Sequence, residues 1–68
     1  MNLDQAIKNV MQAQHYEREQ WAENKRLGLD FSAGINAGRV NAFWEMIHVL
    51  KIIQAEQQPT EEEIAYKL

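Results

Sequence analysis

Apolar residues recur every three to four positions through the first third of the chain, which is the spacing of an amphipathic helix. Asn2 can cap this helix, and Lys25 and Arg26 suit its negative end. Gly28 follows, and glycine readily adopts the left-handed conformation that ends many helices. The pattern predicts a first helix over about 3–27.

The run over 31–57 differs because it is apolar or small on almost every side. Asp30 or Ser32 can cap this second helix, and Pro59 prevents its continuation. Thr60 and Glu63 form a capping box for a short third helix over about 60–68. No segment shows the two-residue alternation of a strand. The sequence therefore predicts one all-α domain over 1–68.

The connection between the two long helices is short, and short connections place neighbouring helices antiparallel. A two-helix hairpin has only one seam, and the second helix carries more apolar surface than one seam can bury. A chain of 68 residues is close to the lower limit for a self-sufficient core, and this one has no cysteine for a disulfide. We therefore expect a dimeric or tetrameric helical bundle; the alternative is a monomer in which the third helix covers the surplus surface.

A helical wheel at about 100° per residue divides the second helix into a stripe of small residues and a broad apolar arc. We interpret the stripe as the close contact with the first helix and the arc as the oligomer interface, although the reverse assignment is open. The stripe consists of Gly34, Ala37, Gly38 and Ala42, and the arc of Ile35, Val40, Phe43, Trp44, Met46, Ile47, Leu50 and Ile53.

Polar residues interrupt the apolar faces of both helices near the middle of the predicted hairpin. If the turn is centred near Leu29, residues whose numbers sum to about 58 lie opposite one another. We then expect a buried network in which Arg18 pairs with Glu45 and Glu17 with Asn41 or His48, because buried charges must be paired. The full candidate set is Gln14, Glu17, Arg18, Arg39, Asn41, Glu45 and His48.

Two other interpretations of this polar patch are open. Glu45 and His48 form Glu-x-x-His, which resembles the ligand spacing of four-helix di-iron carboxylate proteins, with Glu17 as a further ligand. Alternatively, Arg18 or Arg39 binds a small anion, and Trp21, Trp44 or Tyr16 supplies a stacking surface.

The formal net charge of −3, from 7 basic and 10 acidic residues, argues against a nucleic-acid partner, which requires a basic surface. We expect no signal peptide, no membrane span and a cytoplasmic location. No catalytic constellation is present, so we predict a non-enzymatic protein without a cofactor that self-associates and binds a protein partner, as a regulator, inhibitor or assembly factor. Compact acidic helical chains of this type are common among small accessory and phage-encoded proteins, although a fold does not imply a function.

Overall fold

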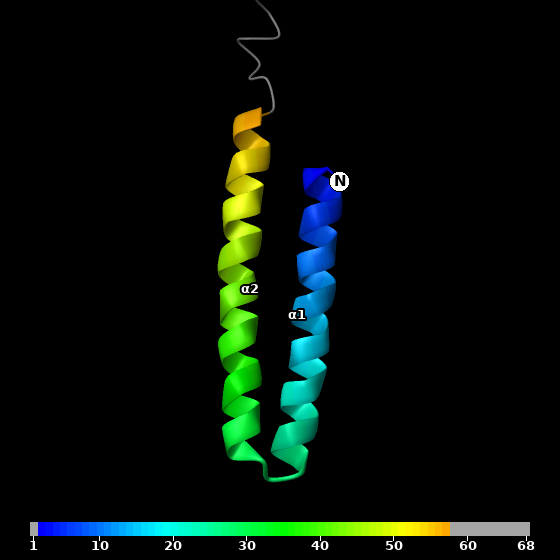
Figure 1. Ribbon diagram of the computed structural model, residues 1–68, viewed down its shortest axis with the longest axis vertical. Helices are drawn as coiled ribbons and strands as arrows, with labels where there is room; N and C mark the ends of the chain where they lie inside the picture. The colour runs from blue at the N-terminus through cyan, green and yellow to red at the C-terminus, as the bar shows by residue number, and fades with distance from the viewer. Residues whose placement is uncertain (1, 58–68) are drawn as a thin grey trace, which may run out of the picture.

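The computed structural model describes residues 2–57, which form an antiparallel hairpin of two long helices (Figure 1). α1 covers Leu3–Arg26 and α2 covers Asp30–Gln57. Within this range there is no strand, so the predictions of an all-α fold and of a helical hairpin are confirmed. The predicted third helix over about 60–68 lies outside the described residues.

The start of α1 follows from the chemistry of its cap. The backbone N–H of Gln5 donates to the side-chain oxygen of Asn2 at 2.8 Å, which satisfies one of the free amides at the helix N-terminus. Asp4 lies in the first turn, where its charge favours the positive end of the helix dipole. The capping role predicted for Asn2 is confirmed.

The turn between the helices is a Schellman motif centred on Gly28, whose φ is +74°. The N–H of Gly28 donates to the carbonyl of Lys25 at 3.1 Å, and the N–H of Leu29 donates to the carbonyl of Asn24 at 2.8 Å. These bonds satisfy the last carbonyls of α1 and reverse the chain within three residues. α2 then begins at Asp30, one residue earlier than predicted, with the Lys25 ammonium 3.2 Å from the Asp30 carboxylate.

The two helices meet along positions separated alternately by three and four residues, the heptad pattern of a coiled coil. We call this contact the inner seam. All its members are buried or half-buried: Leu3, Ile7, Val10, Gln14, Glu17 and Asn24 on α1, and Ala33, Asn36, Val40, Phe43, Ile47, Leu50 and Gln54 on α2. The side chains of Gln54 and Asp4 are hydrogen-bonded at the open end of the hairpin.

The apolar core of this seam is small. Among the described residues only Ile7, Ala33 and Ile47 are buried apolar residues, and Gln14, Glu17 and Asn36 are buried beside them. Many large apolar side chains are instead exposed, the most extreme being Phe31 at 84%. One hairpin therefore buries too little apolar surface to account for the composition of α2. Over residues 2–57, neither helix combines the length and apolar character that crossing a bilayer requires.

The small stripe does not face α1, which corrects our preferred assignment. Gly34 and Gly38 are exposed, and a Cβ atom built on either would have no neighbour within 4 Å; Ala42 is exposed too, and Ala37 is half-buried. Four members of the predicted oligomer interface lie in the inner seam instead: Val40, Phe43, Ile47 and Leu50. The error arose because α2 carries two apolar stripes, and α1 packs on the one with larger side chains.

Candidate functional site

A chain of polar contacts crosses the inner seam near its middle. The side-chain amide of Asn36 donates to Glu17 Oε2 at 2.6 Å, and Asn24 Nδ2 donates to Asn36 Oδ1 at 2.6 Å. Arg39 Nη1 donates to the other Glu17 oxygen at 3.3 Å. The Glu17 carboxylate is thus buried between the helices with both oxygens bonded, as a buried charge requires.

Gln14 adds a contact one turn away, where its side-chain amide donates to the backbone carbonyl of Val40 at 3.3 Å. Within residues 2–57 no buried side-chain nitrogen or oxygen lacks a partner. A fully bonded polar layer of this kind fixes the register of a coiled coil more than it stabilises it. The sequence predicted a polar layer at mid-hairpin, and the structure places one there.

The predicted pairings within that layer are wrong. Glu17 bonds Asn36 and Arg39, not Asn41 or His48, and both of those residues are exposed. Arg18 does not pair with Glu45; its guanidinium lies 5.8 Å from the ring centroid of Trp44, at a cation–π distance. Asn36 was not among the predicted residues. The heptad run from Ala33 to Gln54, which includes Asn36, is the signal that would have identified it.

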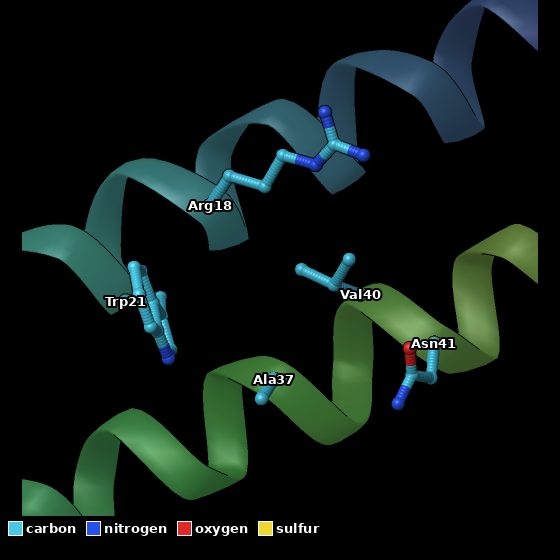
Figure 2. Close-up of a pocket in the computed structure, with 5 residues that line it drawn as sticks. All are labelled: Arg18, Trp21, Ala37, Val40 and Asn41. Carbon is cyan, nitrogen blue, oxygen red and sulfur yellow. The ribbon is translucent and has the colours of Figure 1, made fainter.

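A shallow pocket of about 200 Å³ lies beside the inner seam, lined by Arg18, Trp21, Ala37, Val40 and Asn41 (Figure 2). Trp21 extends from α1 toward α2, whereas the Arg18 side chain runs along α1 with its guanidinium away from Trp21. The pocket therefore brings together an aromatic face, an amide and a cation that were candidates for ligand binding. The cation and the ring do not converge on one point.

The residues proposed as metal ligands are separated by the fold. Glu17 is buried in the inner seam, whereas Glu45 and His48 lie exposed on α2. In the described part of the chain no three carboxylate, histidine or cysteine side chains gather as a metal site requires. Within one hairpin Glu17 therefore does not join Glu45 and His48, because Glu-x-x-His faces away from α1. A site shared between two hairpins, as the four-helix resemblance implied, stays a prediction.

The side of α2 opposite the inner seam carries a second series at heptad spacing, which we call the outer face. Its members are all exposed: Phe31, Ile35, Gly38, Ala42, Glu45, Val49 and Ile52. The equivalent outward positions of α1 are polar except for Tyr16: Gln5, Asn9, Gln12, Tyr16, Glu19, Glu23 and Arg26. The helix surface farthest from α1 is thus apolar or small at every position but one, where a soluble helix is normally polar.

Surface electrostatics elsewhere on the hairpin follow local helix pairs. Arg26 bonds both oxygens of Glu23, at 2.6 and 3.0 Å, and this pairing lowers the pKa of the Glu23 carboxyl below its ordinary value. His15 and Glu19 lie 2.8 Å apart one turn from each other on α1. Exposed pairs of this kind contribute little to stability, and they place no reactive group in a cleft.

Comparison with known proteins adds no relative: no family model matches the chain, and neither the curated proteins nor the solved structures yield a match. The function is therefore argued from the surfaces of the hairpin.

Proposed function

We propose that this chain is a non-enzymatic, cytoplasmic protein that self-associates through the outer face of α2 and acts by binding a protein partner, as a regulator, inhibitor or assembly factor. The observation that carries the proposal is the exposure of that face. Phe31, Ile35, Val49 and Ile52 are exposed by 84%, 43%, 52% and 45%. Contiguous exposed apolar surface marks an association site in proteins of this size.

The small apolar core of one hairpin also supports self-association, because it supplies little stability. A single core in a chain this short rarely supplies more than about 3–5 kcal/mol, and polar groups occupy the centre of the inner seam. The chain has no cysteine, so disulfides cannot add stability, and burial between subunits is the source that we propose. Closed dimers are the commonest form of such assemblies.

The partner surface that we propose is the edge of the hairpin where Arg18, Trp21 and Trp44 gather. Trp21 and Trp44 are exposed by 42% and 51%, and Arg18 lies over the Trp44 ring. Tryptophan and arginine are the residues most enriched among those that dominate protein–protein affinity. This edge is separate from the outer face, so a dimer leaves it accessible on both subunits.

Sedimentation of the full chain at micromolar concentration tests the self-association. We expect a dimer or tetramer whose melting temperature rises with concentration, because assembly stabilises the folded state by mass action. A monomer that melts cooperatively at a temperature independent of concentration would refute the proposal. For the partner surface, Trp44→Ala should abolish capture of a partner that Tyr16→Ala retains. Tyr16 is the control because it is an exposed aromatic residue, at 59% against 51% for Trp44, on the outward side of α1.

A second candidate function is the binding of a small aromatic anion in the pocket of Figure 2, with the Trp21 ring as the stacking face and the Arg18 guanidinium turned from Trp44 toward the anion. A thermal-shift screen of nucleotides and aromatic carboxylates tests it. Stabilisation by a ligand that Trp21→Ala removes would support this function, and no shift at millimolar concentration would contradict it.

A further inference from the structure

We propose that a second copy of this chain packs antiparallel on the outer face, with the two-fold axis passing beside Ala42. The proposal rests on the self-association proposed above and adds its geometry. It commits to one occupant because the residues of the outer face are arranged almost symmetrically about Ala42 in size, and because this arrangement sets Glu45 at the level of an opposite charge on the second copy.

In the antiparallel pair, large residues of one copy lie opposite large residues of the other, and small residues lie opposite small ones. When α2 of one chain runs antiparallel to α2 of another and Ala42 faces Ala42, residues whose numbers sum to 83 or 84 lie at the same level. Ile35 then meets Val49 of the second copy, and Phe31 meets Ile52. At the centre two small residues meet, so the helix axes can approach to about 8 Å. The apolar contacts at both ends span roughly 32 Å from 31 to 52.

Charge complementarity selects the same arrangement independently. Glu45 is the only charged member of the outer face, and in the part of the chain that the structure describes it has no ion-pair partner. The antiparallel register places it at the level of Arg39 of the second copy, since their numbers sum to 84. Arg39 is 59% exposed in its side chain, although it also contacts Glu17. The two-fold axis repeats this pairing, so two interchain ion pairs flank the small centre.

The proposed dimer gives a reason for glycine at position 38. A Cβ atom on Gly38 would have nothing within 4 Å in the hairpin, so the fold of one chain does not require glycine there. Glycine in a helix interior costs about 1 kcal/mol relative to alanine. At the two-fold centre, Gly38 lies at the level of Glu45 of the second copy. The missing side chain then gives room for the longer one.

Single cysteine variants test the geometry directly, because the chain contains no other cysteine. Ala42, Ala55 and Ala22 are all exposed helical residues, which makes their variants matched. Helix axes about 8 Å apart bring the two Cα atoms of residue 42 within disulfide range. Under mild oxidation we expect Ala42→Cys to run as a covalent dimer. The antiparallel register sets the two copies of residue 52, another exposed member of the outer face, about 30 Å apart, so Ile52→Cys should stay uncross-linked. Ala55→Cys and Ala22→Cys, which lie off the outer face, are controls that should stay uncross-linked too.

The pattern of cross-linking separates the outcomes. A dimer by sedimentation in which both Ala42→Cys and Ile52→Cys cross-link would indicate a parallel pair and overturn the geometry. A dimer in which Ala42→Cys does not cross-link would place the contact elsewhere, leaving the self-association standing. A monomer, for example one in which residues 58–68 occupy the outer face, would overturn the geometry and the self-association together.

Charge reversal provides the second test. In Glu45→Arg, two arginines face each other at each flank, and in Arg39→Glu two glutamates do, so each variant alone should dissociate about tenfold more readily. Mixed together, the two variants restore both ion pairs, and the mixed dimer should form in preference to either self-pair. Because Arg39 also bonds the buried Glu17, thermal melts followed by circular dichroism check that each variant keeps a folded hairpin. If Arg39→Glu does not fold, the dissociation constant of Glu45→Arg against wild type decides the assignment. Equal dissociation constants for wild type, single variants and mixture would overturn the assignment of Arg39 and Glu45.

Discussion

Replacing Asn36 with alanine should be the most damaging small change to the hairpin. Asn36 donates to Glu17 at 2.6 Å and accepts from Asn24 at 2.6 Å, and it is buried. A hydrogen bond to a charged group contributes about 1.5–3 kcal/mol and a neutral one about 0.5–1.5 kcal/mol. Losing both therefore lowers the free energy of unfolding by roughly 2–4.5 kcal/mol, which is most of what a core of this size supplies.

The measurement is urea unfolding followed by far-ultraviolet circular dichroism at one fixed protein concentration, because the proposed assembly would make stability depend on concentration. Asn41→Ala is the matched control, since Asn41 lies on the same helix but is exposed. Both variants gain the same helix propensity, so their difference isolates the buried contacts. If the two variants agreed within about 0.5 kcal/mol, the network would contribute nothing measurable and our reasoning would be refuted.

The same network makes an opposite prediction for a double variant. Replacing Glu17 and Asn36 together with leucine removes the buried charge along with its partner. Apolar replacements of buried polar pairs are often neutral or stabilising by about 1–4 kcal/mol. We expect Glu17→Leu/Asn36→Leu to be at least as stable as the wild type, but to lose the unique helix register. Sedimentation would then show a mixture of assembly states.

Three further predictions follow from the turn, the surface and the outer face. Gly28→Ala should lower the free energy of unfolding by about 1–2 kcal/mol, because Gly28 has a positive φ. Gly34→Ala should raise it by about 1 kcal/mol, because a Cβ atom there meets no neighbour and alanine favours the helix. Urea unfolding measures both changes. Pairing with Arg26 lowers the pKa of the Glu23 carboxyl in the folded protein. The pair therefore stabilises the fold fully above the pKa that Glu23 has in the unfolded chain, and this contribution is lost as the pH falls through its folded-state pKa. In Arg26→Gln, NMR titration should show a higher pKa for Glu23. Val49→Lys should shift sedimentation toward monomer.

The elements of the fold were predictable because their signals are local. Asn2 caps α1 and Gly28 ends it through contacts within six residues, and both predictions are confirmed. Because the connection is short, the two helices run antiparallel. Helix caps and turns depend on residues that are close in sequence, so the sequence alone contains the information that predicts them.

The face of α2 that meets α1 was not predictable by the same means. Two stripes on α2 have heptad spacing, one containing Val40 and Ile47 and the other containing Ile35 and Val49. Apolar content does not decide between them, since both are largely apolar. What decides is the buried Glu17 of α1, which needs a polar partner at its own level. Asn36 supplies that partner, whereas the other stripe has Gly38 near that level and offers none.

The polar centre of the inner seam has a consequence for how long the protein persists in a cell. A hairpin with so few buried apolar residues opens often, and proteases degrade chains in proportion to the time they spend open. A copy without a partner would therefore be removed faster than an assembled one. The protein would then accumulate only when its rate of synthesis is high enough for copies to assemble before they are degraded. Once synthesis stopped, its concentration would fall quickly.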